Sequence, residues 1–546
     1  MGSRAPTLAE MVADPERESA DAERQEASDE PSDDAETNGS GSAERRRRIG
    51  MFVAIGAALL ALGVAWVLAS PVGAGPDDSF HLASIWCAPT APDDACTNLG
   101  DAFAAGKDFV EVPVEITFEA HCFAFDPFVS AACPGAIEAG TTARALANDG
   151  IYPGLYHAVM GFAVGDEPVN SALLARTLSW TICVGFLAGG WYVLPRRHRA
   201  GYLIMLLVTS IPSALFLWTS TNPSGVVVAA TAAAWCAVVA LVHADDRRER
   251  VVAGILLAVA LVAAIGSRAD GGVYAFVAVI AAGALLWQRG RDRMPAVVGA
   301  GVAAGLALLV SVLILNRRVD GVDQLVTQVD GAAAASSDGL LWNNLREIPF
   351  FLTANLGTEP IGMLDVPMPR IIWASTLATF FGLGFFGLAR LDRRKALSLV
   401  CVLAGLLGIP YFLLWRGGYP VGFEVAARYA LPLVPILGFT LLYWRRATSV
   451  TSLTVAQLSS VLALMSIAHS VALHSTIRRY VTGVGNLSLD LDAGREWWWD
   501  IPITPNMVWL LGSVAFGVLA GLLGWTIRRG ADRAPEDRPS DELTYA

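Results

Sequence analysis

The chain has 546 residues, of which 54% are hydrophobic and only 16% are charged. With a mean hydropathy of +0.49, it is too apolar for an ordinary soluble domain and has the composition of a protein that crosses a membrane several times. The formal net charge of −11 gives no indication of a nucleic-acid partner, because the negative charge is concentrated at the two chain ends.

Acidic segments form both ends of the chain. Residues 1–44 hold 13 Asp and Glu against three Arg, and residues 529–546 are acidic as well. Such segments cannot bury enough apolar surface to fold, so we expect two disordered cytoplasmic tails. The basic run Arg45 to Arg48 precedes an apolar stretch too long for the core of a signal peptide, which predicts a retained first helix.

Residues 45–528 are predicted to form an all-α integral membrane domain with about 12 transmembrane helices, because apolar runs of spanning length recur throughout this region. The runs are residues 49–70, 170–194, 201–219, 224–243, 250–266, 272–288, 295–315, 370–390, 396–415, 427–444, 452–473 and 506–527.

Basic clusters in alternate connections predict the orientation of these helices. Seven such clusters, the first at Arg45 to Arg48 and the last at Arg528-Arg529, fall on one side of a twelve-span arrangement, and Lys and Arg favour the cytoplasmic side. Both termini are therefore expected in the cytoplasm. The segments expected outside the membrane are residues 71–169, 316–369, 416–426 and 474–505.

Four of the seven cysteines lie in the first of these outer segments, which predicts disulfides in an oxidising compartment. Four cysteines allow three pairings, and the most local one joins Cys87 to Cys96 and Cys122 to Cys133. A metal site is the alternative, but the spacing matches no standard zinc pattern.

Two adjacent carboxylates follow the first apolar run, in the stretch Pro76-Asp77-Asp78-Ser79-Phe80-His81. One of them could simply cap a helix. However, two acids with His81 one turn further on exceed what capping needs, and charged groups near a membrane are costly to desolvate. Asp77 or Asp78 could take a proton from a substrate hydroxyl, hold a divalent cation such as Mg²⁺ or Mn²⁺, or do both.

Two arginines lie at the predicted outer ends of spans. Arg268 could pair with Asp270 at a helix end, and Arg428 could pair with Glu424 four residues earlier. Alternatively, their planar guanidinium groups could hold a phosphate.

The Gly- and Pro-rich segment 357–369 is predicted to be a loop, in which Glu359 and Asp365 could contact substrate or remain solvated. No nucleotide-binding loop, serine-nucleophile elbow or His-Glu-x-x-His zinc motif is present.

Four ordered stretches resemble the membrane proteins of domain-of-unknown-function family 2142, which are similar to GT-C-type glycosyltransferases. The stretches are Pro76-Asp77-Asp78 with Phe80-His81, then Asn222-Pro223, then Gly362 to Pro369, and finally Arg428-Tyr429 with Leu431-Pro432. The resemblance implies a GT-C-like fold and transfer of a sugar from a polyprenyl-phosphate donor on the outer membrane face. It also implies that the acidic residue in the first outer loop, Asp77 or Asp78, carries the chemistry, although Asp-Asp here replaces the commoner Asp-Glu.

The leading hypothesis is therefore an inverting glycosyltransferase with the lipid bilayer, a polyprenyl-phosphate-linked sugar and an envelope glycan or lipid acceptor as partners. Asp77 or Asp78 would be the base with His81 beside it, Arg268 and Arg428 would hold the donor phosphate, and Glu359, Asp365 and Tyr429 would contact substrate. The many Ala, Gly and Val residues, and Arg in place of Lys, indicate the plasma membrane of a GC-rich bacterium of the actinobacterial kind. A lipid-linked-sugar flippase or other transporter, and a non-catalytic envelope assembly factor, are the alternatives.

Overall fold

The computed structural model describes residues 2, 34–99, 109–132, 140–148, 150, 152–287, 294–326, 337–444 and 453–532. The chain falls into two compact units, residues 1–57 and 58–546. Helix α2 (Asp34–Leu68) begins in the first unit and ends in the second. All of the residues proposed above for a functional site belong to the second unit. The predicted tails lie outside the described residues, except for Gly2, residues 34–44 and residues 529–532.

Nine helices of the described residues are long and apolar enough to cross a membrane, counted by length and composition. They are Arg45–Leu68 within α2, α5 (Pro168–Val193), α8 (Pro223–His243), α9 (Arg247–Ser267), Met294–Leu315 within α11 (Met294–Val326), α14 (Arg370–Leu388), α15 (Arg393–Gly417), α17 (Val455–Thr482) and Pro505–Arg529 within α18 (Pro505–Asp532).

The other three predicted spans form shorter helices, so the count of about 12 is not confirmed. The run 201–219 is divided into α6 (Arg196–Thr209) and α7 (Ser213–Trp218) around Pro212, and the run 272–288 forms α10 (Gly271–Leu286). The run 427–444 forms the 3-10 turns η4 (Ala427–Tyr429) and η5 (Leu431–Leu433), followed by α16 (Val434–Leu442). Proline cannot donate a backbone hydrogen bond, which accounts for the interruption of the first and third of these runs; α10 contains no proline.

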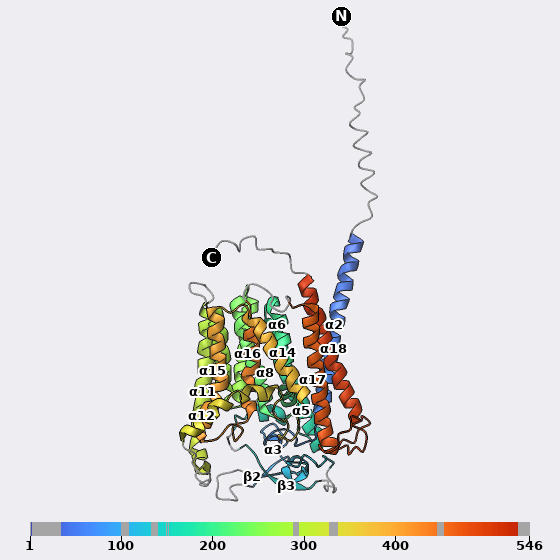
Figure 1. Ribbon diagram of the computed structural model, residues 1–546, viewed down its shortest axis with the longest axis vertical. Helices are drawn as coiled ribbons and strands as arrows, with labels where there is room; N and C mark the ends of the chain where they lie inside the picture. The colour runs from blue at the N-terminus through green and yellow to red at the C-terminus, as the bar shows by residue number, and fades with distance from the viewer. Residues whose placement is uncertain are drawn as a thin grey trace. The chain divides into compact units, whose positions relative to one another are not determined.

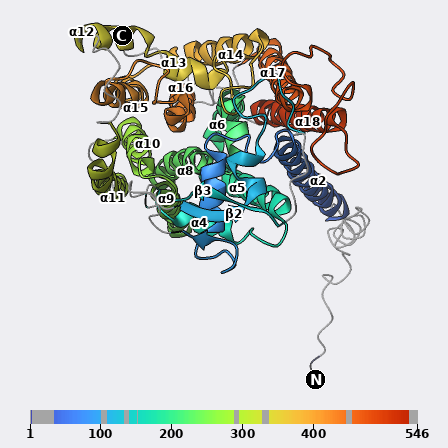
Figure 2. The ribbon, with the colours of Figure 1, turned by 90° about the horizontal axis from the view of Figure 1, so that it is seen from below.

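Helix α8 forms the centre of the helical bundle. It packs against α5, α9 and α10, and α10 lies between α11 and α15 (Figure 2). Nearly every residue of α8 is buried. Its Ala and Val side chains are small enough to allow neighbouring helices to approach closely, which is typical of packed membrane helices.

The two ends of the bundle differ in chemistry. At one end, His198 near the start of α6 stacks on Tyr443 after α16 with ring centroids 4.4 Å apart, and it also contacts His243 at the end of α8. Arginine-rich segments begin α6, α9 and α15 at this end. At the other end lie α3 (Asp78–Trp86) and the small β-sheet, which are seen below the long helices in Figure 1.

The first predicted outer segment contains a three-stranded antiparallel sheet, which the all-α expectation did not include. Strand β2 (Phe109–Pro113) lies between β1 (Thr97–Asn98) and β3 (Thr142–Leu146), with Glu111 opposite Arg144. Val110 and Val112 are buried while their neighbours are partly exposed, which is the alternation expected of a strand with one face on a core.

Short helical segments complete this end of the chain. They are η1 (Val114–Ile116), η2 (Phe118–Ala120), α4 (Leu155–Gly161), α12 (Ser337–Glu347), α13 (Phe350–Thr353) and η3 (Ala354–Leu356).

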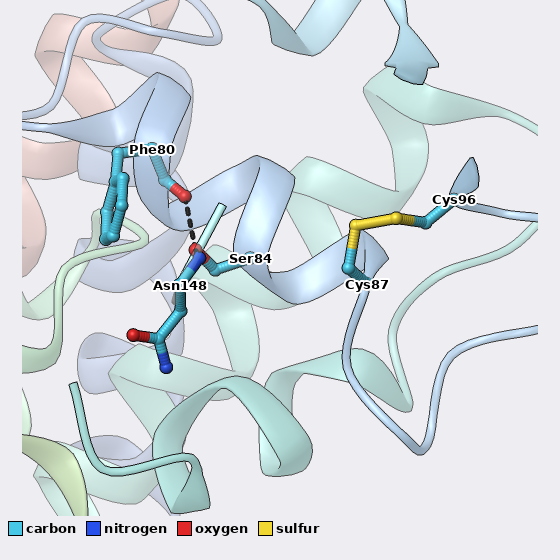
Figure 3. The surroundings of a disulfide bond; sticks show 5 residues. All are labelled: Phe80, Ser84, Cys87, Cys96 and Asn148. Carbon is cyan, nitrogen blue, oxygen red and sulfur yellow. Dashed lines mark hydrogen bonds between the residues drawn. A yellow bond between two sulfur atoms is a disulfide. The ribbon is translucent and has the colours of Figure 1, made fainter. Parts of the chain in front are cut away.

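A disulfide joins Cys87 to Cys96, as predicted. It ties the end of α3 to the segment before the sheet, while Ser84 on the same helix donates to the Phe80 carbonyl and accepts from the Asn148 backbone N–H (Figure 3). Cys122 is disulfide-bonded too, but its predicted partner Cys133 lies outside the described residues. Both ends of α3 are therefore fixed, the first by the contacts described next and the second by the disulfide.

Candidate functional site

The two adjacent aspartates face different surroundings. Asp77 adopts the left-handed backbone conformation (φ 57°, ψ 22°), and α3 begins at the next residue. This turn separates the two carboxylates, so that the Asp78 side chain is fully buried whereas the Asp77 side chain is 50% exposed. Asp77 occupies the N-cap position of α3, but among the described residues its side chain makes no capping hydrogen bond.

Asp78 belongs to a buried network that joins three parts of the chain. Its Oδ2 accepts from the backbone N–H groups of Gly73 (3.1 Å) and Gly75 (3.2 Å) and from the Arg176 guanidinium (3.1 Å). Its Oδ1 accepts from the Thr221 hydroxyl. Arg176, from the middle of α5, is itself only 1% exposed. A buried carboxylate with a cation and several donors is well satisfied.

Arg176 also fixes the end of the first spanning helix. It donates to the carbonyl oxygens of Val67 (3.4 Å), Ser70 (2.8 Å) and Pro71 (2.6 Å). Val67 lies in the last turn of α2, where a helix leaves carbonyl oxygens without partners of its own. The Asp78 network therefore holds together the chain that leaves α2, the start of α3 and the start of α8.

The aspartate pair does not fit a metal ion. Both Asp78 oxygens are occupied by hydrogen-bond donors, one of which is a cation, and Asp77 faces another arginine. Over the described part of the chain, no group of three or more His, Cys, Asp and Glu side chains converges. A hard cation such as Mg²⁺ requires several free oxygen ligands.

Asp77 forms an ion pair with Arg428, 351 positions away in the chain, with Nη2 and Oδ2 2.8 Å apart. Arg428 is 19% exposed, and its Nε is buried without a hydrogen-bond partner among the described residues. Its guanidinium carbon lies 5.4 Å from the centre of the Tyr429 ring. The predicted alternative, a pair with Glu424, is not formed among the described residues, because Glu424 stands in a separate turn with a positive φ of 59°.

Arg268 is more fully occupied than Arg428. It makes a bidentate ion pair with Asp270 at 2.7 and 2.8 Å, and its third nitrogen donates to Ser224. Its guanidinium carbon lies 4.7 Å from the centre of the same Tyr429 ring. Tyr429 thus brings the two arginines predicted from sequence to one place, with one of them committed to Asp270.

His81 contacts neither aspartate through its ring. Its Nδ1 lies 3.3 Å from Nε2 of His157, its ring packs edge-on against Tyr152, and both histidines are almost fully buried. Burial lowers the pKa of His81 well below its usual value, and His157, Arg268 and Arg428 lower it further. The two neutral imidazoles therefore pack against each other and against Tyr152.

A small pocket of about 40 Å³ opens beside the Asp77–Arg428 pair, and we call it the Arg428 pocket. It is lined by Pro76, Ser213, Phe216, Leu217, Ala354, Asn355, Glu359, Pro360, Ile361, Gly362, Leu364, Ala426 and Arg428. The Glu359 side chain is partly buried there, and burial raises its pKa while Arg428 acts in the opposite direction. Two of the residues predicted from separate segments, Glu359 and Arg428, therefore meet at one cavity.

Asp365 is placed differently from Glu359, although the same loop carries both. Its carboxylate pairs with Arg479 at 2.7 Å, with both side chains buried, and also accepts from the Met363 backbone N–H. Arg479 further donates to the carbonyl oxygens of Phe123, Asp126 and Val129. This arrangement joins the loop to α17 and to residues 123–129, so Asp365 fixes the loop.

Sequence reasoning did not single out Arg176 and Thr221, which hold Asp78 in place. An arginine in the middle of an apolar helix is itself a signal, because a charge at that depth needs a partner. Asn222 was noticed as part of a motif, and the structure gives its contacts: its side chain donates to the Pro76 carbonyl at 2.8 Å and caps α8 by accepting from Ser224.

Comparison with known proteins agrees with this architecture. The family model described as "Predicted membrane protein (DUF2142)" matches residues 59–437, which include the Asp78 network and the Arg428 pocket. No curated protein and no solved structure matches the chain. Since the match covers more than half of the chain, this multi-pass membrane protein belongs to domain-of-unknown-function family 2142.

Proposed function

We propose that this protein is an inverting glycosyltransferase that moves a sugar from a polyprenyl-phosphate donor to a glycan or lipid of the cell envelope. The observation that supports the proposal most is the Arg428 pocket, which is lined by a partly free guanidinium and by the carboxylate of Glu359, while Asp77 contacts the same guanidinium. The pocket lies at the bundle end opposite the arginine-rich helix starts. The positive-inside rule assigns the arginine-rich end to the cytoplasm and the pocket to the outer face.

Arg428 is suited to the phosphate of the donor. A guanidinium offers a planar set of donors that matches phosphate oxygens, and here Nε has no partner while Nη2 contacts Asp77. When the bond between sugar and phosphate breaks, negative charge grows on the leaving phosphate, and a fixed cation there stabilises the transition state. Arg268 contacts the ring of the neighbouring Tyr429 while it remains paired with Asp270, and it adds positive charge near the same place.

The pocket has room for the reacting groups only. A volume of about 40 Å³ accommodates a few water-sized groups, so the sugar ring and the lipid extend beyond it. Phe216 and Leu217 form an apolar part of the wall, which suits the first units of a prenyl chain. A carboxylate at the opposite side is placed to take the proton of an acceptor hydroxyl.

Transport is less well supported than transfer. In transporters, substrate sites lie near the middle of the membrane at broken helices, whereas the Arg428 pocket lies where helices end. Detergent solution distinguishes the two functions, because it has no second compartment. Transfer releases polyprenyl phosphate there, whereas transport produces no chemical change.

The test incubates the purified protein with a panel of polyprenyl-phosphate-linked pentoses and hexoses and with envelope glycan, and measures release of free polyprenyl phosphate. We expect release by the unaltered protein and its loss in Arg428→Ala. Arg416→Ala is the matched control, because Arg416 is an exposed arginine in the last turn of α15 and does not line the pocket. If no donor is consumed, or if Arg428→Ala acts like the control, the proposal is wrong.

A second measurement asks the same question in cells. A strain that lacks the protein should accumulate a polyprenyl-phosphate-linked sugar in its lipid extract, and the Arg416→Ala protein, but not Arg428→Ala, should remove it. An unchanged lipid extract in the deletion strain would contradict a role in donor consumption.

A further inference from the structure

We propose that Glu359 is the group that accepts the proton of the acceptor hydroxyl, and that Asp77 is a positioning residue that holds Arg428. This inference rests on the proposed function and changes the assignment of its base. It departs from what the family resemblance implies, in which an aspartate of the first outer loop takes the proton.

The ion pair commits Asp77 to Arg428. Its Oδ2 lies 2.8 Å from a guanidinium nitrogen of Arg428, and Asp77 does not line the Arg428 pocket, in which the acceptor hydroxyl would meet the donor phosphate. A general base must lie within hydrogen-bond reach of the proton that it takes. What the contact does supply is orientation, because it fixes the guanidinium at the edge of the pocket.

Asp78 is excluded as the general base more firmly than Asp77. Its side chain has no exposed surface, and both oxygens are engaged by Arg176, Thr221 and backbone N–H groups. An acceptor hydroxyl cannot come within hydrogen-bond reach of it, which general base catalysis requires.

Glu359 has the opposite surroundings. It lines the Arg428 pocket, and among the described residues its carboxylate makes no ion pair and no side-chain hydrogen bond. Burial raises its pKa, which strengthens it as a base. Arg428 lines the same cavity, and the two side chains form no ion pair with each other.

The backbone holds Glu359 in register with Arg428. Gly357 ends η3 in a left-handed turn with φ 101°, and the Ile361 and Val366 backbones pair with each other on the far side of Glu359. Asn355, in η3, donates to the Ala427 carbonyl at 2.8 Å, directly before Arg428 in the chain. A base and a phosphate-binding cation fixed to one another in this way satisfy the positioning that transfer requires.

The reaction balances with these groups. The acceptor oxygen gives its proton to the Glu359 carboxylate and forms a bond to the anomeric carbon of the sugar. The bond from that carbon to the phosphate oxygen breaks, and its electron pair stays on polyprenyl phosphate, whose charge Arg428 stabilises. Glu359 afterwards returns its proton to water.

The test measures turnover and phosphate binding separately in Glu359→Gln, Glu359→Asp and Asp77→Asn. Turnover is the release of polyprenyl phosphate from the donor panel, and binding uses undecaprenyl phosphate in detergent as the probe. Glu347→Gln is the matched control, because Glu347 is an exposed glutamate on α12 outside the pocket.

We expect Glu359→Gln to lower turnover roughly 10²–10⁴-fold while binding of undecaprenyl phosphate stays within twofold of the unaltered protein. Asp77→Asn should instead weaken that binding and raise KM more than it lowers kcat. Turnover of the unaltered protein should fall at low pH as Glu359 is protonated, and the residual turnover of Glu359→Gln should lack this fall. Glu359→Asp, which keeps the carboxylate, should recover part of the loss.

The inference is overturned if Glu359→Gln keeps a tenth or more of the turnover, or if Asp77→Asn shows the larger loss in kcat with unchanged phosphate binding. Either result leaves the glycosyltransferase proposal standing, and the second one makes Asp77 its base. Absence of turnover in the unaltered protein refutes the proposed function, and the assignment of Glu359 fails with it.

Discussion

The two adjacent aspartates should respond very differently to the same substitution. Asp78→Asn removes the charge of a fully buried carboxylate but keeps its shape, while Asp77→Asn does the same to a side chain that is half exposed. We expect Asp78→Asn to destabilise the fold strongly and Asp77→Asn to leave it nearly unchanged. The neighbouring position is thus the matched control.

The magnitude follows from the partners of each carboxylate. Removing one member of a buried ion pair typically lowers the free energy of unfolding by about 3–5 kcal/mol, because the other charge stays buried and unpaired. In Asp78→Asn, moreover, one oxygen becomes an NH₂ group that faces donors from Gly73, Gly75, Arg176 or Thr221. Arg176 keeps its bonds to three carbonyl oxygens, so a cost of roughly 3 kcal/mol is expected.

Asp77→Asn breaks an ion pair that solvent already screens. Exposed pairs contribute about 0–1 kcal/mol, so the unfolding free energy of this variant should stay within about 1 kcal/mol of the unaltered protein.

The assay is equilibrium unfolding in mixed detergent micelles with increasing SDS. A thiol-reactive dye would report exposure of Cys183 and Cys236, which are buried in the folded chain, and circular dichroism would follow helix content. If Asp78→Asn unfolds at the same SDS fraction as Asp77→Asn, the Asp78–Arg176 pair does not stabilise this fold and the reasoning is wrong.

Three further predictions concern the packing around this site. Gly73→Ala should destabilise the protein more than Gly140→Ala, although both glycines have a positive φ. An added Cβ at Gly73 would come within 1.9 Å of the buried His121 ring, whereas Gly140 has open space. Overpacking of this kind costs about 1–3 kcal/mol. Cys87→Ser should lower stability by roughly 2–3 kcal/mol, as expected for a short disulfide loop, while Cys401→Ser, at a free cysteine, should have little effect. Burial lowers the pKa of His121 to about 4, and since the unfolded chain titrates near 6.5, its contribution to stability is complete above that pH and falls by about 2 kcal/mol at pH 5.

The same SDS titration measures all three, the last of them at several pH values. Equal effects of the two glycine substitutions would mean that the His121 ring moves aside without cost. Equal effects of the two cysteine substitutions would show that the disulfide adds no stability. A His121→Gln variant with an unchanged loss of stability below pH 6.5 would assign that loss to other groups.

Part of this architecture is visible in local sequence patterns. Nine of the predicted spans form helices long enough to cross a membrane, because a long apolar run is helical in lipid whatever lies elsewhere in the chain. The pairing of Cys87 with Cys96 was predicted for a similar reason, since nine positions of separation place the two side chains near each other. Two of the three runs that departed from the expectation of long helices are interrupted at proline, such as the one around Pro212. The third forms α10, which contains no proline.

The candidate site was predictable as a set of residues but not as an arrangement. Charged side chains at span ends drew attention to Asp77, Asp78, Arg268 and Arg428, and the loop composition to Glu359. Their partners come from far along the chain: Arg428 is 351 positions from Asp77, and Arg176 is 98 positions from Asp78.

By itself, then, the sequence determined that this is a multi-pass membrane protein with a disulfide in the segment after its first span, and it singled out a few charged residues. Only the tertiary structure decided which aspartate is buried with Arg176, which one meets Arg428, and that Glu359 lines the pocket without an ion-pair partner in the part of the chain that the structure describes. The physical reason is that hydropathy and helix length depend on neighbours in the chain. Desolvation and ion pairing depend on neighbours in space, and the chemistry of a carboxylate is set by those.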